Sequence, residues 1–546
     1  MNTHTEQPKA KVNRLLAKNI LTGSASKIGY LLTRFFIPPF VLMHVGIERY
    51  GIWATCFILV GYLGVSTVGI SNVYLKYVAE FDARKEYDRA NSLLSTGIFI
   101  TMPLCTLLFA GVWFAWPQLI GFLHINPALQ TDAREVALTV IGVFLGSIGI
   151  SAFRDALMGS QKISNLQGTW VIGYLLETFF IWYLVSNGRG IRGLVEAFLI
   201  RNVVENVLNI ILAYRKLPWL HVSWRNFDRC NIRTIFHFGG AVQMMSLLAI
   251  VLDSIERAIA VPLIGVGGAG LLEIGTKLPT MAVLLPNSFS TAFLPAASYL
   301  SGGINCMKER SSTISQLYLR GARYMNLTSA YFCAFLALFP VAILSVWLHQ
   351  KFDGITLILV VFAVTTQLHL LTGPGTSILK GIGRPWQELR YSGANIVLLL
   401  VTLPVTRLIF GQWNTSVIAI GVCAATVLAS AYFLFHANRL LSVDFASYLR
   451  KVLVPGAVPY IAAGLLAWPV NHLVANCGRW VGFAWLGAGG ALYTVLAFGF
   501  VYFGVLATEE KAKIISAWKS LAARFSNLRN GTDLSNDQIA NAGIAA

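Results

Sequence analysis

The segment Val45–Thr55 has the sequence VGIERYGIWAT, and it has a counterpart near the middle of the chain, IGVGGAGLLEI at Ile264–Ile274. These two segments are separated by about 219 residues, and a second pair is separated by about 222. The second pair consists of LMGSQK at Leu157–Lys162 and LKGIGR at Leu379–Arg384. Because two matches occur at nearly the same shift, the sequence indicates an internal repeat in which one structural unit occurs twice.

The composition indicates that these units lie in a membrane. Of the 546 residues, 56% are hydrophobic and only 12% are charged, against about 25% charged in soluble domains. A water-soluble fold of this size cannot bury so much apolar surface, so the sequence predicts an integral membrane protein. The first residues, MNTHTEQPKAKVNRLLAKN, are polar and basic without a small-residue cleavage site, and we expect no cleaved signal peptide.

Hydropathy in a window of about 19 residues predicts about 14 membrane spans. Their length and continuity favour helices over the alternating strands of about 10 residues that build membrane barrels. The predicted spans are Asn19–Met43, Tyr50–Tyr74, Asn91–Trp116, Glu135–Leu157, Gly168–Val185, Gly193–Tyr214, Ile235–Ala260, Gly270–Leu294, Ala322–Leu348, Ile355–Ile378, Ser392–Ile409, Ser416–Phe435, Leu453–Leu473 and Val481–Leu506.

The repeat divides the spans into two lobes. An even number of spans separates the copies, so both have one orientation and are related by an axis along the membrane normal. We therefore predict an all-α integral membrane protein with about 14 transmembrane helices, in which two pseudo-symmetric six-helix lobes surround a central cavity and two extra helices follow. The predicted divisions are a cytoplasmic N-terminal segment 1–18, an N-lobe 19–214, a basic loop 215–234, a C-lobe 235–438, the last two spans 439–506 and a cytoplasmic tail 507–546.

The distribution of basic residues predicts the orientation. The net charge is +18, and about 28 of the 42 Lys and Arg residues fall in segments that are cytoplasmic if the N-terminus is. Both termini are then cytoplasmic, and the excess charge reflects topology and contact with anionic lipid, not nucleic acid.

The tail begins with EEKAKIISAWKSLAARFSNLRN, whose apolar residues recur at helical spacing. This pattern predicts an amphipathic helix on the cytoplasmic membrane surface.

The sequence contains no signature of a cofactor or a metal site. The seven cysteines are scattered without a CxxC pair, which argues against a disulfide framework or a zinc site. There is no HExxH cluster and no GxxxxGK[ST] loop, so ATP-driven transport would require a partner subunit. We expect neither a cofactor nor a metal, and no enzymatic activity.

The stretch GIERYGIWATCFILVGYLGVSTVGISNVYLKYVAEFDARKEYDRANSLLSTG resembles the Wzx-type lipid-linked oligosaccharide flippases and polysaccharide exporters. These belong to the multidrug/oligosaccharidyl-lipid/polysaccharide (MOP) exporter superfamily. The resemblance rests on Tyr50-Gly51-Ile52-Trp53, the glycines Gly61, Gly64 and Gly69, the charged loop leading to Asn91, and the paired Gly159 and Gly381. It implies two six-helix bundles that form a V around a cavity, and movement of undecaprenyl-diphosphate-linked sugars from the cytoplasmic to the periplasmic leaflet of the bacterial inner membrane. The implied partners are this lipid-linked oligosaccharide, membrane lipids, and polysaccharide polymerase or assembly proteins.

Charged residues within the spans suggest where a substrate binds. LAIVLDSIERAIAV in the seventh span contains Asp253 and Arg257 at i,i+4, and the eighth span contains Glu273 and Lys277 at the same spacing. With Gly265 as the midpoint of a helical hairpin, Arg257 comes beside Glu273 and Asp253 beside Lys277. These charges either neutralise one another between the two spans or line a hydrated cavity that binds a ligand.

The first span favours the second interpretation. Lys27 and Arg34 are seven residues apart, on nearly the same face of the first span, which contains no acidic residue. Lys27 lies near enough to the cytoplasmic end to extend to the interface, whereas Arg34 does not. In the sixth span, Arg201 has Glu205 four residues later, so mutual pairing competes with ligand binding there. Cations that converge on one space would attract a diphosphate, and arginine can bind its oxygens through two hydrogen bonds.

Ion coupling requires a group that exchanges a proton or Na⁺. The carboxylates that we consider for this role are Asp253, Glu273, Glu177 and Glu205, in that order.

Two further segments are hinge candidates. Pro38 and Pro39 should kink the first span, and Gly373, Pro374 and Gly375 should break or unwind the tenth.

Three functions are compatible with these features. The first is a flippase or exporter for a polyprenyl-diphosphate-linked oligosaccharide, an O-antigen or exopolysaccharide repeat unit, which works by alternating access and is ion-coupled. The second is a multidrug or peptidoglycan-precursor exporter of the same superfamily; a drug antiporter should have an acid in the first span, where this chain has Lys27 and Arg34. The third is a membrane polysaccharide polymerase or ligase, which should have a larger outer loop.

Overall fold

The computed structural model describes residues 29–31, 33–122, 125–160, 162–284, 286–287, 307–348, 354–384, 386–506 and 508–512, with Phe293, Ala297 and Leu300. Inside the helices, the side chains of 62, 64–69 and 236–258, among others, are not described. The described chain is helical almost throughout. A first helix, Gly29–Val45, is followed by α2 (Ile47–Arg84), α3 (Tyr87–Phe122), α4 (Gln130–Gly149), α5 (Ala152–Gly159), α6 (Ile163–Ser186), α7 (Gly190–Lys216), α8 (Arg229–Ala282), α10 (Met307–Leu338), α11 (Pro340–Trp347), α12 (Ile355–Leu370), α13 (Thr372–Gly381), α14 (Trp386–Phe410), α15 (Thr415–Leu440), α16 (Phe445–Tyr448), a π-helical turn (Leu449–Leu453), α17 (Val454–Ala475) and α18 (Arg479–Gly504).

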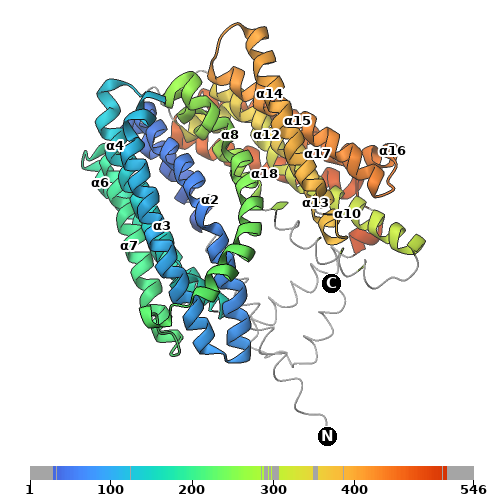
Figure 1. Cartoon of the computed structure of the whole chain (residues 1–546). Coiled ribbons are helices and arrows are strands. Elements are labelled where there is room, and N and C mark those ends of the chain that lie inside the picture. The colour runs from blue at the N-terminus through green and yellow to red at the C-terminus, as the bar shows by residue number, and fades with distance from the viewer. Residues whose placement is uncertain are drawn as a thin grey trace, which may run out of the picture.

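The helices form the predicted two-lobed membrane fold. In the described part of the chain, 8 helices are long and apolar enough to cross a membrane, or up to 10 if each of two bent pairs counts as one span. Together with the first helix, α2, α7 and the first part of α8, they are consistent with about 14 spans. Helices α2–α7 lie on one side, α10–α18 on the other, and α8 lies between them (Figure 1). The chain is therefore a multi-pass membrane protein, as predicted.

The repeat predicted from the sequence is visible in the backbone. Gly46 separates the first helix from α2 with φ 82 and ψ 165, and Gly265 interrupts α8 with φ 75 and ψ 177. These two glycines are equivalent under the shift of about 219 residues, and both occupy a positive-φ region that favours glycine. The second pair of segments agrees too, because Lys162 donates its N–H to Leu157 O at 2.9 Å and Arg384 donates to Leu379 O at 2.8 Å.

Two equivalent glycines bring the lobes into backbone contact. A Cβ on Gly51, in α2, would lie 1.9 Å from Val266 O, and a Cβ on Gly270, in α8, would lie 3.1 Å from Ile47 O and from Gly51 Cα. Gly51 thus faces Val266, and Gly270 faces Ile47, which is the position equivalent to Val266 in the repeat. A reciprocal contact of this kind lies on a two-fold axis, here the pseudo-two-fold axis of the repeat, and it requires residues without side chains. We call this contact the glycine crossing.

Several helices extend beyond the predicted membrane spans. The loop expected between the seventh and eighth spans is reduced to Gly265, because α8 is helical on both sides of that residue. The second span extends to Arg84 through a segment that was expected to be a cytoplasmic loop. Hydropathy locates the apolar part of a helix and not its ends, so charged turns beyond the membrane were assigned to loops.

Two predicted single spans are bent. The fourth span consists of α4 and α5, which meet at 46°, and the ninth consists of α10 and α11, which meet at 74°. Pro340 begins α11. Asn471, in α17, satisfies the backbone groups at this bend: it donates Nδ2–H to Leu338 O at 2.8 Å and accepts the Ala342 N–H at 2.9 Å. The bend therefore does not leave these polar groups unpaired in the apolar interior.

The predicted break of the tenth span occurs as an interruption of one residue between α12 and α13, and no longer segment of this span is unwound. Gly373, Pro374 and Gly375 lie inside α13, and the helical path is interrupted only at Leu371. This interruption comes directly after Leu370, whose carbonyl would accept from residue 374 in a regular helix, and proline has no N–H to donate.

The two prolines of the first helix lie inside a helical segment and are buried. Pro39 lacks the N–H that Phe35 O would accept, and Trp347 of α11 donates its indole N–H to that oxygen at 2.7 Å. The proline thus creates a hydrogen bond between the first helix and the C-lobe, where the rings of Phe35 and Trp347 also stack at 5.8 Å. Whether any of these prolines or glycines acts as a hinge stays a prediction.

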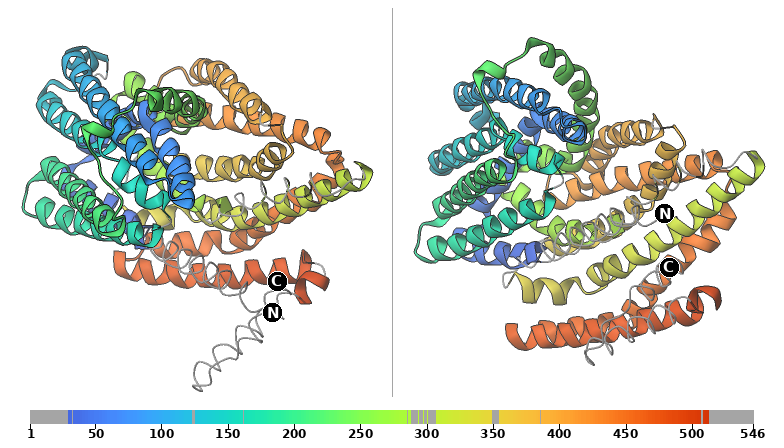
Figure 2. Two further views of the ribbon diagram at one scale, coloured as in Figure 1. Left: turned by 60° about the horizontal axis from the view of Figure 1, so that its bottom comes forward. Right: turned by 90° about the horizontal axis from the view of Figure 1, so that it is seen from below.

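The two extra helices are attached to the C-lobe by a buried polar network. Helices α17 and α18 lie along the outside of this lobe beside α10 (Figure 2). Asn326 of α10 donates to Val452 O in the π-helical turn at 2.7 Å. Gln367 donates to Asn326 Oδ1 at 2.8 Å, and Tyr460 donates to Gln367 Oε1 at 2.5 Å. Since buried polar groups are stable only when they are paired, this chain of hydrogen bonds fixes α17 and the π-helical turn against α10 and α12.

Candidate functional site

A cavity of about 840 Å³ lies between the first helix and the C-lobe helices α8 and α12–α15. Its wall extends from Glu273, one turn beyond Gly270, to Lys380 and Glu388 on either side of the turn between α13 and α14. The cavity thus begins near the glycine crossing and reaches the opposite end of the molecule. Arg34 enters the wall from the N-lobe, and the other four charged side chains belong to the C-lobe.

The cavity lining carries more positive than negative charge. It contains three cations, Arg34, Lys277 and Lys380, and two carboxylates, Glu273 and Glu388. Lys277 donates to Glu273 Oε1 at 2.9 Å within α8, and Lys380 is paired with Glu388. Partial neutralisation lowers the cost of keeping these cations in an apolar region and leaves ammonium donors that can exchange partners.

Arg34 is held in the cavity wall by a buried carboxylate. Glu177, in α6, is 3% exposed and accepts from Arg34 Nη2 at 3.0 Å and from Arg201 Nη1 at 2.9 Å. Arg201 lies in α7, and its Nε is 3.6 Å from Glu205 Oε2. The Arg34 guanidinium also lies over the Tyr30 ring, 5.0 Å from its centroid. Since a guanidinium has five N–H donors, Arg34 can pair with Glu177 and still bind an anion in the cavity.

The Glu177 cluster supports a prediction about stability. We expect Glu177→Gln to lower the free energy of unfolding by about 3 kcal/mol or more, because it removes the buried anion that two partly buried guanidiniums share. Glu196→Gln is the matched control: Glu196 pairs with Arg189 at 3.0 Å, but the two side chains are 38% and 60% exposed. An exposed pair contributes about 1 kcal/mol or less. Chemical denaturation of both purified variants tests the difference, and equal stability would contradict the assigned role of Glu177.

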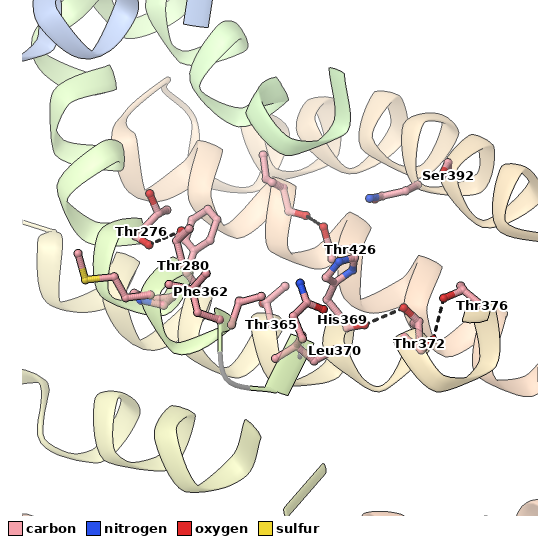
Figure 3. Close-up of a pocket in the computed structure, with 18 of the residues that line it drawn as sticks. Thr276, Thr280, Phe362, Thr365, His369, Leu370, Thr372, Thr376, Ser392 and Thr426 are labelled. Atoms are coloured by element: carbon pink, nitrogen blue, oxygen red, sulfur yellow. Dashed lines mark hydrogen bonds between the residues drawn. The ribbon is translucent and has the colours of Figure 1, made fainter. Parts of the chain in front are cut away.

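Hydroxyl side chains dominate the remaining polar part of the wall. Thr276, Thr280, Thr365, Thr372, Thr376, Ser392 and Thr426 all line the cavity from C-lobe helices (Figure 3). Several donate their O–H to a carbonyl of their own helix; Thr276 donates to Leu272 O at 2.8 Å and Thr376 to Gly373 O at 2.9 Å. A hydroxyl that donates in this way keeps acceptor lone pairs. The wall therefore offers acceptors to a ligand rich in hydroxyl groups.

The structure brings together only some of the residues that the sequence suggested. Arg34, Glu273 and Lys277 share the cavity, whereas Glu177, Arg201 and Glu205 form the cluster behind Arg34 and are not part of its lining. Glu273 pairs with Lys277 of its own helix. Lys27 lies outside the described residues, as do the side chains of Asp253 and Arg257, and the tail beyond residue 512. The substrate-binding and coupling roles of all these residues stay predictions.

Sequence reasoning missed Lys380 and Glu388 as parts of the site. Both belong to KGIGRPWQELR, which lies between the predicted spans Ile355–Ile378 and Ser392–Ile409, and their place at one end of the cavity follows from how α13 and α14 pack. The hydroxyl wall was also missed. Four of its threonines, Thr276, Thr280, Thr372 and Thr376, occur as pairs at i,i+4, a spacing that places each pair on one helix face.

Two curated proteins are similar to this chain in sequence. No family model matches the sequence. "Uncharacterized membrane protein EpsK" of Bacillus subtilis is 20% identical over 465 residues, covering 83% of this chain and 88% of that protein. "Putative O-antigen transporter" of Shigella flexneri is 20% identical over 282 residues, covering 50% of this chain and 64% of that protein.

Solved structures have the same fold. The lipid II flippase MurJ in an inward closed conformation has a TM-score of 0.64 at 13% identity and covers 88% of this chain and 99% of its own. A multidrug resistance MATE family transporter of the MOP superfamily, in its inward-facing conformation, has a TM-score of 0.58 at 15% identity over 76% of this chain and 98% of its own. The chain is thus a membrane protein with the MOP transporter fold. Its resemblance to the Wzx-type flippases and polysaccharide exporters is confirmed.

Proposed function

We propose that this protein is a flippase that moves a polyprenyl-diphosphate-linked oligosaccharide across the bacterial inner membrane, with both termini in the cytoplasm. The observation that carries the proposal is the cavity between the lobes, in which Arg34 of one lobe and Lys277 of the other face one space. A diphosphate carries the opposite charge, and guanidinium and ammonium groups are the side chains that recognise it. The threonine and serine hydroxyls of the cavity wall can form hydrogen bonds with the attached sugars.

The proposed mechanism is alternating access of the two lobes. In the predicted topology, the glycine crossing lies at the outer surface and Lys380 at the inner one, so this conformation corresponds to a cavity closed towards the outside. The diphosphate would enter between Lys380 and Arg34, and the lobes would then separate at the glycine crossing. Glu273 is the coupling group that we favour, because it lies in the cavity and can exchange Lys277 for a proton or Na⁺.

The names of the relatives support transport rather than catalysis. One is named "Putative O-antigen transporter", and a protein of the same fold is named a lipid II flippase. We therefore favour an O-antigen or exopolysaccharide repeat unit as the cargo over drugs, and we place polysaccharide polymerase and assembly proteins among the expected partners. A polymerase or ligase activity is not part of this proposal.

Deletion of the gene tests the proposed cargo. We expect surface polysaccharide to be lost and lipid-linked repeat units to collect on the inner leaflet while the cells continue to grow, because a flippase dedicated to surface polysaccharide does not supply peptidoglycan synthesis. Expression from a plasmid should restore the polysaccharide. Growth arrest with accumulation of peptidoglycan precursor would instead assign that precursor as cargo. Unchanged polysaccharide with increased drug sensitivity would assign a multidrug exporter.

A further inference from the structure

A second cavity, of about 730 Å³, lies away from the proposed transport path. It is bounded by α10, the π-helical turn with the start of α17, and the end of α18. Four cations line it: Arg320 and Arg323 from α10, and Arg450 and Lys451 from the π-helical turn. No acidic residue contributes to this lining, in contrast to the mixed charges of the larger cavity.

One of the four cations, Arg323, is paired with a carboxylate from the tail. Arg323 donates to Glu510 Oε2 at 3.2 Å and to Val505 O at 2.5 Å, and Tyr324 donates its O–H to Glu510 Oε1 at 2.5 Å. Among the described residues, no carboxylate lies within salt-bridge distance of Arg320, Arg450 or Lys451. Three cations therefore converge on a space whose lining contains no acidic residue, and Glu510 competes with a bound anion only for the fourth cation, Arg323.

The cavity borders a surface that faces lipid. Directly after Lys451, α17 presents a stripe of exposed apolar side chains at helical spacing: Val454, Ile461, Leu465 and Trp468, between 58% and 77% exposed. Basic residues at the end of such a stripe mark the level of the lipid headgroups. In the predicted topology this end is cytoplasmic, where the leaflet is rich in anionic lipid.

We propose that this cavity binds the phosphate of an anionic phospholipid headgroup, whose acyl chains lie along the apolar stripe of α17. Arg450 and Lys451 contact the phosphate, and Arg320 supports them from α10. A bound phosphate competes with Glu510 for Arg323, so lipid binding and the contact between the tail and α10 oppose one another. This site does not depend on the proposed cargo, and it would exist in a transporter of another substrate.

The test measures lipid binding to the purified full-length chain in a neutral detergent. Native mass spectrometry follows titration with phosphatidylglycerol and, separately, phosphatidylcholine. We expect phosphatidylglycerol to bind more tightly, and the double variant Arg450→Ala/Lys451→Ala to bind it roughly tenfold or more weakly. Arg215→Ala/Lys216→Ala is the matched control, because it removes two adjacent exposed cations from the end of α7; its affinity should stay within about twofold.

Two further measurements keep the outcome decisive. Glu510→Gln, which weakens the competing contact, should increase phosphatidylglycerol affinity, and Arg320→Ala should decrease it even if the double variant fails to fold. Equal losses in both double variants would show only general attraction to charge and would overturn the proposal. Displacement of the lipid by an equal concentration of inorganic phosphate would identify free phosphate, rather than a lipid headgroup, as the ligand.

Discussion

Arg34→Ala is expected to reduce export of surface polysaccharide about 10- to 100-fold, because a charge-assisted contact with the substrate diphosphate contributes about 1.5–3 kcal/mol. Lys277→Ala should act in the same direction from the opposite wall of the cavity. Arg34→Lys should restore part of the activity, since it keeps the charge but loses the planar fork that binds two phosphate oxygens. The measurement is surface polysaccharide per cell, with the level of each variant in the membrane determined in parallel.

Arg201→Ala is the matched control for Arg34→Ala. Both arginines donate to Glu177, at 2.9 Å and 3.0 Å, but only Arg34 lines the cavity. If Arg34 acts on the substrate, its replacement should reduce export far more than the replacement of Arg201 at equal membrane levels. If both variants lose export to the same extent, Arg34 serves only to satisfy Glu177. Normal export by Arg34→Ala and Lys277→Ala would refute the cationic cavity, even though the fold would stand.

Gly51→Ala is expected to prevent the lobes from closing at the glycine crossing. The new Cβ would lie 1.9 Å from Val266 O and 2.7 Å from Val266 C, and these backbone atoms cannot move without displacing α8. We expect export to fall at least about tenfold if a state closed at this end belongs to the transport cycle. Gly270→Ala should have a smaller effect, because its Cβ would meet its neighbours at 3.1 Å.

The lobe separation can be measured directly. His44 and Leu263 are equivalent positions of the repeat, and both are exposed near the crossing. Spin labels at cysteines introduced there, with the seven native cysteines replaced, should move apart in Gly51→Ala. Gly111→Ala is the control, because nothing lies within 4 Å of its Cβ position. An unchanged distance together with normal export in Gly51→Ala would contradict a closed crossing.

Much of the fold could be predicted from composition and pattern. Apolar runs of about 20 residues must be helical in a bilayer, since every backbone polar group has to be paired within its own segment. The two repeat matches identified Gly46 and Gly265 as equivalent positions, and the backbone angles at both residues agree. The end of α2 was predicted poorly, because its charged turns continue the same hydrogen bonding outside the apolar region.

The site was predicted only in part. An arginine without an acid in its own span identified Arg34 as unusual, but the sequence did not reveal that its partner is Glu177, 143 positions later. The hydrogen bond from Trp347 to Phe35 O could not be predicted from the sequence either, since its partners are 312 positions apart. Lys380 was assigned to a loop, and the four cations of the second cavity come from two segments that no local pattern connects.

The sequence by itself determined that this protein is a helical membrane protein with an internal repeat, because hydropathy and self-similarity depend on residue type and spacing along the chain. The tertiary structure decided which charges meet. Ion pairing depends on distances of about 3–4 Å between side chains of different helices, and those distances follow from how the helices pack. Glu177 therefore pairs with Arg34 and Arg201, and the glycine crossing brings together two residues whose equivalence alone did not imply contact.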